Sequence, residues 1–209
     1  MQVFLLDKNT NKTEYINEAA KIIKRGGTAI FPTETVYGLG ADIFNTRAVE
    51  SIYKIKTRSY QKPLAAHISS LDQVHILCDE VPDMFYLLAQ KFLPGPLSII
   101  VPAGKNIPDI VTSNTRTISI RYPSNQVCKE FITACETPLA ATSANISGKT
   151  SPITALQALS ELNNKVDVVL DAGECELKTE STVIKIINDS IQVLREGAIP
   201  STEILKILK

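Results

Sequence analysis

Apolar positions along the chain follow two spacings, one typical of helices and one typical of strands. Over residues 15–25 the apolar side chains recur three and four positions apart, which indicates one face of a helix. Over residues 117–121 they alternate, so Ile118 and Ile120 share one face of a strand. These spacings predict helices over residues 15–25, 46–56, 82–92, 125–135 and 154–162, with a short terminal helix that opens at 200. They predict strands over residues 3–6, 28–31, 64–68, 97–101, 117–121, 139–142, 166–170, 182–187 and 192–194.

The order of these elements indicates an α/β domain. Strands and helices alternate to the end of the chain, with no internal repeat and no low-complexity linker. Thr46 and Ser124 each precede or open a predicted helix and are expected to cap it. Two strands run into polar loops, over residues 33–40 and 143–152, and such strand ends are where open α/β sheets place ligands. We therefore expect one α/β domain over residues 1–209, with these loops as candidate binding segments.

Composition narrows the class of protein. The 22 basic and 22 acidic side chains cancel, which argues against a dedicated nucleic-acid binder, because such proteins gain affinity by neutralising phosphates. A local basic pocket for a small phosphorylated ligand is still compatible with this balance. The four cysteines form no CxxC pair, so no zinc or redox site is predicted and reduced thiols are expected. The chain starts without a signal-peptide pattern and holds no run long enough to span a membrane, so we expect a cytoplasmic protein without membrane contact.

The densest group of charges is basic and lies at the end of the predicted helix over residues 46–56. Four cations fall within nine residues, namely Lys54, Lys56, Arg58 and Lys62. One interpretation is a solvated basic face, which the helix dipole favours at a C-terminus. The other is a clamp for phosphates, in which lysine supplies point charge and arginine a planar fork. The residues alone leave both interpretations open.

Other candidate residues lie within strands or directly after them. His67 stands in an apolar strand, where a histidine is more often a packed core residue than a site residue. Arg121 ends an alternating strand and could serve a carboxylate, a phosphate or a surface acid. The loops over residues 33–40 and 143–152 combine hydroxyl groups with glycines. Such loops bind phosphate through backbone N–H groups, but they are also ordinary turns.

Together these segments resemble one known family over roughly residues 15–200. The resemblance is to the YrdC-type threonylcarbamoyl-AMP synthase family, whose motifs appear here in the family's order. They are the PTETVYGLG loop (32–40), KxR (56–58), KPL (62–64), PGP (94–96), RxP (121–123), TSANxSG (142–148), STV (181–183) and RxG (195–197).

The resemblance implies a fold and a set of site residues. The implied fold is a twisted, mixed, open α/β sheet with helices, curved around a large ligand cavity. The residues implied for threonine are Thr35, His67, Arg121 and Ser181, with Arg121 on the carboxylate. The residues implied for ATP are Lys56, Arg58, Lys62, Thr117, Ser143, Asn145, Ser151 and Arg195. Lys56 and Arg58 are also implied as catalytic residues. Together with Lys62 and a magnesium ion they are the implied charges that stabilise departing pyrophosphate, and no metal site built by the protein is implied.

The activity implied by the resemblance is the synthesis of threonylcarbamoyl-AMP and pyrophosphate from L-threonine, bicarbonate or carbon dioxide, and ATP. The product would serve the modification of a tRNA adenosine next to the anticodon, with other proteins making the transfer. An RNA-binding module and a HypF-like carbamoyl-transfer module are the alternatives. Zero net charge and few aromatic residues disfavour the first. The second is disfavoured because HypF-like proteins carry an acylphosphatase region and paired-cysteine zinc motifs, and this sequence shows neither.

The chain departs from the family pattern at a few positions. Ser59 stands where proline is frequent, Ser98 where threonine is common, and Ala141 where a hydroxyl residue is frequent. None of these departures removes a charged residue of the implied site. Because no linker follows the last motif before Lys209, we expect the single-domain form of the family.

Overall fold

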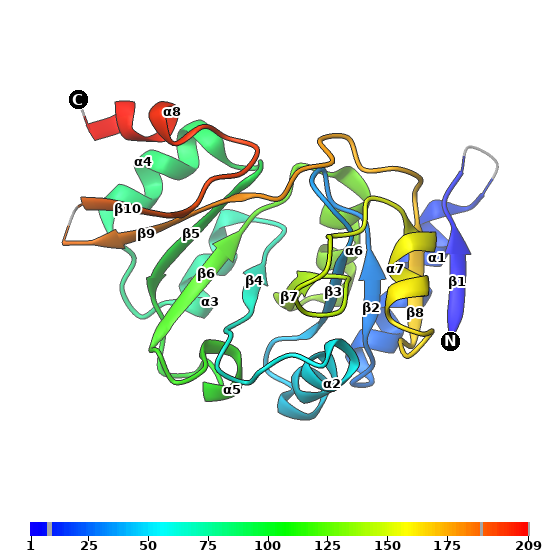
Figure 1. Cartoon of the computed structure of the whole chain (residues 1–209). Helices are drawn as coiled ribbons and strands as arrows, with labels where there is room; N and C mark the ends of the chain where they lie inside the picture. The colour runs from blue at the N-terminus through cyan, green and yellow to red at the C-terminus, as the bar shows by residue number, and fades with distance from the viewer. Residues whose placement is uncertain (8–9, 189, 209) are drawn as a thin grey trace.

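The computed structural model describes residues 1–7, 10–188 and 190–208 of the chain. Ten strands within these residues form one sheet in the order β1-β8-β2-β3-β7-β4-β6-β5-β9-β10, with parallel and antiparallel neighbours mixed along it. Figure 1 shows the pronounced twist of this sheet, and the twisted, mixed α/β architecture is therefore confirmed. The strands are β1 (Gln2–Leu5), β2 (Ala29–Phe31), β3 (Gly38–Asp42), β4 (Ala65–His67), β5 (Leu97–Pro102), β6 (Thr117–Arg121), β7 (Leu139–Ser143), β8 (Val168–Asp171), β9 (Thr182–Ile187) and β10 (Ser190–Arg195). The helices are α1 (Lys12–Lys24), α2 (Thr46–Lys56), α3 (Val74–Leu77), α4 (Asp83–Phe92), α5 (Asp109–Thr112), α6 (Gln126–Cys135), α7 (Ala155–Glu161) and α8 (Ser201–Leu205), with 3-10 turns η1 (Leu71–Gln73) and η2 (Lys206–Leu208).

Two hydrophobic cores lie on opposite faces of the sheet. On one face, α1 and α6 pack over β2, β7 and β8, and Ile23 and Phe131 are buried there with Phe31. On the other face, α2, α4 and α7 bury a larger core that includes Ile30 and Leu39. Ile30 and Phe31 are neighbours in β2, so their side chains alternate between the two cores. Burial on both faces fixes the register of these strands, because a slip of one residue would exchange the two sets of side chains.

The strand register places a row of polar side chains on one face of β4, β6 and β5. Arg121 of β6 lies opposite His67 of β4 on one side and opposite Ser98 of β5 on the other. Residues directly opposite each other in neighbouring strands point to the same face. Ile118 and Ile120 of β6 point to the other face, where they are buried in the larger core. The predicted alternation of this strand is therefore confirmed, and it turns Arg121 away from the isoleucines.

The predicted loop over residues 33–40 is wrong in its second half, because Gly38–Asp42 forms strand β3 between β2 and β7. The glycines in β3 hid it from the sequence pattern, since they add no apolar side chain. Their bare backbone is needed here, because a Cβ on Gly40 would stand 2.9 Å from the ring of Phe31. The ring therefore packs directly on β3, and the loop shortens to residues 32–37.

Two predicted helix caps are wrong by one residue. Asn45, and not Thr46, caps α2, with its Oδ1 accepting a hydrogen bond from Ala48 N at 3.1 Å. Asn125, and not Ser124, caps α6 in the same way. In both cases the asparagine carboxamide satisfies the N–H of the third helical residue. The helices α3 and α5, which the sequence pattern did not predict, have four residues each and are too short to show an apolar period.

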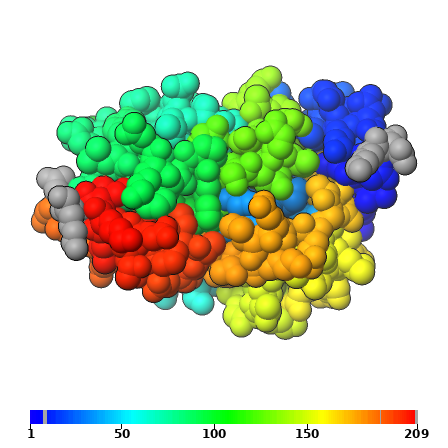
Figure 2. Space-filling view, turned by 90° about the horizontal axis from the view of Figure 1, so that it is seen from above, coloured from blue at the N-terminus to red at the C-terminus, as the bar shows by residue number. Residues whose placement is uncertain are grey.

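After β8 the chain crosses the top of the molecule to reach β9 in the other half of the sheet (Figure 1). Figure 2 shows this crossing segment, residues 172–181, in orange on the surface seen from above. Backbone hydrogen bonds hold it, from Cys175 N to Ile153 O at 2.9 Å and from Leu177 N to Glu34 O at 2.8 Å. The end of the crossing segment thereby reaches the polar row on β4, β6 and β5.

The structure can be compared with two expectations from the sequence, namely reduced cysteines and the lack of a membrane-spanning segment. All four cysteines are buried and none forms a disulfide. Within the described part of the chain, no helix combines the length and the apolar character needed to cross a lipid bilayer.

Candidate active site

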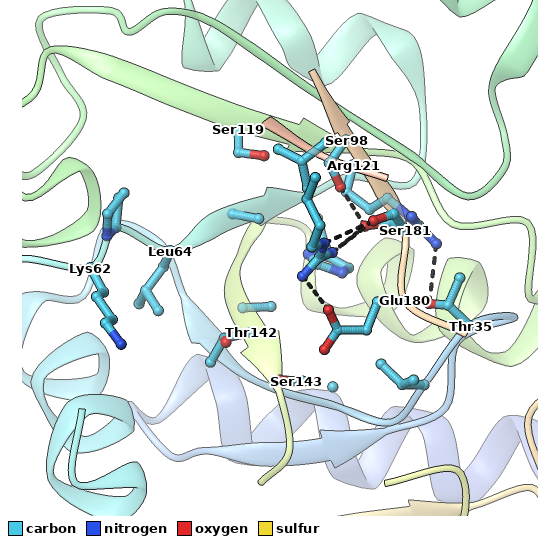
Figure 3. A pocket seen from close by; sticks show the side chains of 18 of the residues that line it. Thr35, Lys62, Leu64, Ser98, Ser119, Arg121, Thr142, Ser143, Glu180 and Ser181 are labelled. Carbon is cyan, nitrogen blue, oxygen red and sulfur yellow. Dashed lines mark hydrogen bonds and ion pairs between the residues drawn. The ribbon is translucent and has the colours of Figure 1, made fainter. Parts of the chain in front are cut away.

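A cleft of about 450 Å³ opens over the polar row, at the middle of the sheet. Its volume lies in the range typical of small-molecule sites. Its walls come from the loop over residues 32–37, the segment after α2, strands β4 to β7 and β9, and the end of the crossing segment. Figure 3 shows these side chains converging from both halves of the molecule. The hydroxyl and ionisable side chains in the lining include Thr33, Thr35, Ser98, Thr117, Ser119, Thr142, Ser143, Ser181, Arg58, Lys62, His67, Arg121, Glu180 and Arg195.

A buried ion pair stands at one end of the cleft. Arg121 Nη2 donates to Glu34 Oε1 at 2.6 Å, and only 3% of each side chain is exposed. The same nitrogen lies 3.4 Å from Thr35 Oγ1. Among the described residues, Nε and Nη1 of Arg121 have no hydrogen-bond partner. Burial lowers the pKa of Arg121 and Glu34 opposes that shift, but an arginine stays protonated in a protein. The guanidinium therefore lines the cleft with one nitrogen paired to Glu34, while its other two nitrogens are buried without a partner.

His67 lies beside this pair on β4. Its ring meets the ring of Phe31 edge-on, with the centroids 5.9 Å apart. Its Nδ1 has no hydrogen-bond partner among the described residues. Burial, and then the charge of Arg121, lower the pKa of His67 to about 3. The imidazole is therefore neutral at physiological pH and can take part in hydrogen bonds without adding charge.

A second carboxylate–arginine pair stands at the same end of the cleft. Glu180, in the crossing segment, forms an ion pair with Arg195 through Oε2 and accepts a hydrogen bond from Ser151 through Oε1. Arg195 also donates from Nε and Nη2 to the carbonyl oxygen of Ser181, at 3.1 and 2.8 Å. Ser181 Oγ in turn lies 2.9 Å from Ser98 Oγ. Both arginines at this end of the cleft thus have a carboxylate of the protein beside them.

The opposite end of the cleft carries positive charge without a neighbouring carboxylate. Arg58 is half-buried and donates to two carbonyl oxygens, to Lys62 O from Nε at 3.1 Å and to Pro63 O from Nη2 at 2.9 Å. Lys62 is exposed, and Figure 3 shows it well apart from Arg121. Within the described residues neither cation forms an ion pair. This end therefore favours a ligand with several negative charges.

Lys56 holds the loop that follows β7. Its side chain is buried, and Nζ donates to the carbonyl oxygens of Ser143 and Asn145 and lies 3.3 Å from Asn145 Oδ1. Asn145 Oδ1 also accepts from Ser143 Oγ at 2.6 Å, and its Nδ2 donates to Lys149 O. Burial, and then the charge of Arg58, lower the pKa of Lys56 to about 7. The three oxygen acceptors around Nζ favour its ammonium form, so Lys56 fastens the end of α2 to this loop.

The basic cluster after α2 therefore does not behave as one unit. Lys54 is exposed and pairs with Glu50 at 3.0 Å, as expected for a solvated helix face. Lys56 has only 1% of its surface exposed, so the solvated interpretation is wrong for this residue. Arg58 and Lys62 line the cleft.

The structure brings most of the predicted site residues together. Nine of the twelve line the cleft, namely Thr35, Arg58, Lys62, His67, Thr117, Arg121, Ser143, Ser181 and Arg195. The other three are bonded to lining residues, Lys56 and Asn145 to Ser143, and Ser151 to Glu180. The ligand assigned to each of the twelve stays a prediction.

Two acids that organise the cleft, Glu34 and Glu180, are missing from the predicted set. Glu34 lies inside the 32–40 motif, and Glu180 directly precedes Ser181. A signal was available, because a buried arginine needs a counter-charge and each acid adjoins a predicted site residue. Ser119 was missed as well, although strand alternation places it on the same face of β6 as Arg121.

A family model for the Sua5, YciO and YrdC proteins, described as "Telomere recombination", matches residues 21–197. The chain belongs to the Sua5/YciO/YrdC family. All twelve predicted site residues fall inside the matched segment.

Similar members of the Sua5/YciO/YrdC family include proteins of comparable and of greater length. The chain is 38% identical to the threonylcarbamoyl-AMP synthase of Pyrococcus abyssi over 193 residues, 92% of this chain and 57% of that protein. It is 41% identical to a putative threonylcarbamoyl-AMP synthase of Methanocaldococcus jannaschii over 180 residues, 86% and 84% of the two chains. The crystal structure of P. abyssi Sua5 complexed with L-threonine matches with a TM-score of 0.95 at 36% identity, over 100% of this chain and 61% of that one. The chain thus spans about three-fifths of the P. abyssi protein and most of the M. jannaschii protein.

Proposed function

We propose that this chain is a threonylcarbamoyl-AMP synthase, which joins L-threonine, bicarbonate and ATP and releases pyrophosphate. The observation that carries the proposal is the distribution of charge along the cleft. One end holds two arginines with carboxylates beside them, and the other holds two cations without one. A cleft of this kind suits an amino acid at the first end and a polyphosphate at the second. The names of the relatives and the threonine complex of the P. abyssi protein support the same assignment.

Threonine occupies the end of the cleft that holds Arg121. The two unpaired nitrogens of Arg121 are buried in the free protein, and a small movement of the guanidinium presents them as a fork to the threonine carboxylate, which a lysine could not reproduce. Thr35, His67 and Ser181 supply hydrogen-bonding groups around it. Because His67 is neutral and the arginines are paired, this end does not attract a polyphosphate as strongly as the other.

ATP occupies the cleft toward Arg58 and Lys62, whose uncompensated charges face its phosphates. A magnesium ion arrives with ATP as part of the substrate, because Mg²⁺ is typically held by substrate phosphates and water. The described residues contain no cluster of three or more histidine, cysteine, aspartate or glutamate side chains that would hold a separate ion. The remaining nucleotide contacts come from Thr117 and Ser143, and from Ser151 and Arg195 where the α-phosphate meets the threonine end of the cleft.

The chemistry requires positioning and charge and no protein nucleophile. The threonine ammonium group first gives up a proton to solvent; the resulting amine attacks the carbon of bicarbonate, and water leaves to give a carbamate. A carbamate oxygen then attacks the α-phosphorus of ATP, and the bond from that phosphorus to the bridging oxygen breaks to release pyrophosphate. Arg58 and Lys62 stabilise the negative charge that develops on the leaving group. Lys56 and Asn145 act one step removed, by fixing the loop that carries Ser143.

The product serves the threonylcarbamoyl modification of tRNA, with the transfer made by other proteins. Zero net charge agrees with a small-molecule enzyme that does not itself bind tRNA tightly. The four free, buried cysteines agree with a reducing compartment such as the cytoplasm.

The deciding experiment is a pyrophosphate-release assay. We expect release from ATP that depends on both threonine and bicarbonate, with threonylcarbamoyl-AMP identified by mass spectrometry. Omitting each substrate in turn is the control. Pyrophosphate release without threonine, or turnover of carbamoyl phosphate in place of bicarbonate and ATP, would contradict the proposal.

A further inference from the structure

We infer that Glu34 sets the ligand charge that this end of the cleft accepts, so that an amino-acid zwitterion is preferred to a simple carboxylate anion. The inference rests on the proposed function in one respect, namely that the Arg121 end of the cleft binds an amino acid. It goes further, because it assigns a specificity-determining task to a residue outside the cleft lining.

The first observation is that Glu34 and Arg121 are committed to each other. Their contact is 2.6 Å long, both side chains are 3% exposed, and within the described residues neither belongs to another ion pair. Glu34 Oε2 has no hydrogen-bond partner there. The carboxylate charge is therefore not shared with any other cation, and it offsets Arg121 alone.

The second observation is that the backbone of Glu34 is held in place. Thr33 Oγ1 donates to Val36 O at 2.6 Å and accepts from the N–H groups of Thr35 and Val36, which closes a tight turn around Glu34. On the other side, Leu177 N of the crossing segment donates to Glu34 O. The backbone that carries Glu34 is therefore fixed beside Arg121, and the carboxylate accepts from Nη2 while Nε and Nη1 have no partner.

The third observation is the count of charges at this end of the cleft. Arg121 is balanced by Glu34, and Arg195 by Glu180. His67 beside them is neutral at physiological pH. The formal charge of this end is therefore zero.

A neutral site built around a buried ion pair discriminates among ligands by their net charge; here Arg121 and Glu34 are buried, while Arg195 and Glu180 are partly exposed. A zwitterion leaves the site neutral when it binds, whereas a bare carboxylate adds an uncompensated negative charge beside the buried Arg121–Glu34 pair. An amino ester, which has lost its carboxylate charge, adds an uncompensated positive one. Removing the charge of Glu34 would leave the site at plus one and shift its preference toward the bare anion.

The test compares ligand pairs on Glu34→Gln and wild-type protein by calorimetry without ATP. The ligands are L-threonine and 3-hydroxybutanoate, which keeps the carboxylate and the hydroxyl but lacks the amine. We expect wild-type protein to prefer threonine. In Glu34→Gln we expect the ratio of the two dissociation constants to shift toward 3-hydroxybutanoate by at least about tenfold, or about 1.4 kcal/mol. Damage to the fold would weaken both ligands together and leave the ratio unchanged.

Two matched variants complete the test. Glu50→Gln removes an exposed acid, paired with Lys54 outside the cleft, and should leave both constants unchanged. Glu34→Asp keeps the charge on a shorter side chain, so both ligands should weaken while the ratio stays within about threefold of wild type.

Each outcome bears on the inference. An unchanged ratio in a Glu34→Gln protein that melts at the wild-type temperature overturns it. So does wild-type protein that binds 3-hydroxybutanoate as tightly as threonine, a measurement that needs no variant to fold. Wild-type protein that binds no amino acid overturns both this inference and the proposed function. Threonine binding with the expected shift, but without pyrophosphate release, would reject the proposed function alone.

Discussion

Arg121 combines three properties that single residues seldom share. It is 2% exposed, it is charged, and two of its nitrogens have no partner among the described residues. An unpaired buried donor costs roughly 1–3 kcal/mol, and more when the group is charged. Under the proposed function the threonine carboxylate would recover that cost, so the arrangement would favour ligand binding over stability of the free protein.

The first prediction follows from the shape of the guanidinium. Arg121→Lys keeps the charge and loses the planar fork, so we expect the Michaelis constant for threonine to rise at least about tenfold, while that for ATP changes less than about twofold. Steady-state kinetics with each substrate varied in turn measure both constants. Arg47→Lys, an exposed arginine on α2, is the matched control and should leave both unchanged. An unchanged threonine constant in Arg121→Lys would remove this residue from the site.

The second prediction concerns protonation of His67. Its pKa falls from 6.5 to about 3 because of burial and Arg121. Between these values the unfolded chain binds a proton that the folded chain does not, so the stability that His67 contributes is lost as pH falls from about 6.5 toward 3. We expect the free energy of unfolding of His67→Gln to fall less steeply with acid than that of wild type. The His67 ring resonances should not titrate between about pH 5 and pH 8.

Only one further variant is needed to assign the ring resonances of His67, because the chain has two histidines. A His75→Gln variant leaves the His67 ring as the single histidine signal. Titration of that signal near pH 6.5 would show that the ring is more accessible to protons than its surroundings indicate.

The arginines of the site could be predicted from the sequence, but the acids that pair with them could not. Arg121 and Arg195 stand out because an arginine at a strand end needs an explanation, but the acids that pair with them depend on the fold. Glu34 lies 87 positions before Arg121 in the chain, and Glu180 reaches Arg195 from the crossing segment. Without the sheet order, no local pattern connects these segments. For the same reason, the sequence could not show that Lys56 is buried.

At the scale of elements, Lys56 joins α2 to the loop after β7, and Ser147 N adds a backbone hydrogen bond to Lys56 O at 3.1 Å. The third prediction is that Lys56→Met destabilises the protein, because it leaves buried carbonyl oxygens without a donor. The expected loss is about 1–3 kcal/mol, or at least about 2 °C in the melting temperature for a chain of this size. Thermal unfolding of purified protein measures it.

Lys54→Met is the matched control, two residues earlier on the same helix. Lys54 is exposed and its pair with Glu50 spans one helical turn, so its loss should cost no more than about 0.5 kcal/mol. Equal melting temperatures for the two variants would contradict the anchoring role of Lys56.

The fourth prediction concerns β3 and the ring that packs on it. A Cβ at Gly40 would stand 2.9 Å from Phe31 and 3.2 Å from Ala140 O. Gly40→Ala should therefore cost about 1–3 kcal/mol, as overpacking does in other cores. Phe31→Leu removes the ring edge and should recover part of that cost, so a double-mutant cycle measured by chemical denaturation should show coupling of at least about 0.5 kcal/mol. Strictly additive effects would mean that the Phe31 ring is not the reason why position 40 requires glycine.

The same strand shows where prediction from the sequence stops. Elements with several apolar positions, such as α2, α6, β6 and β9, could be predicted almost to their ends. β3 could not, because its glycines serve a neighbour's side chain and give no pattern of their own. The mixed order of the sheet also has no local signal, and it came only from resemblance to a family. It is this order that sets His67, Arg121 and Ser98 in one row.

At the scale of the whole molecule, net charge and local charge act differently. The chain as a whole is neutral, so long-range attraction of nucleotides is weak and recognition depends on the cleft. There the two ends differ in exposure as well as in charge. At the paired end Arg121 and Glu34 are buried, and Arg195 and Glu180 are partly exposed. At the other end Arg58 is half-buried and Lys62 is exposed.

The fifth prediction is that salt weakens the binding of MgATP more than the binding of threonine. Raising ionic strength from about 0.05 M to about 0.5 M shortens the screening length to a few ångströms, which weakens exposed charge pairs but hardly affects buried ones. We expect the dissociation constant of MgATP to rise several-fold while that of threonine changes less than about twofold, as measured by calorimetry with free magnesium held constant. Lys62→Gln should flatten the salt dependence for MgATP, because it removes the most exposed cation facing the phosphates, and should leave threonine binding as it was. Equal salt dependence for both substrates would mean that the cleft does not divide into a paired end and an unpaired end, and the assignment of ATP to Arg58 and Lys62 would fail with it.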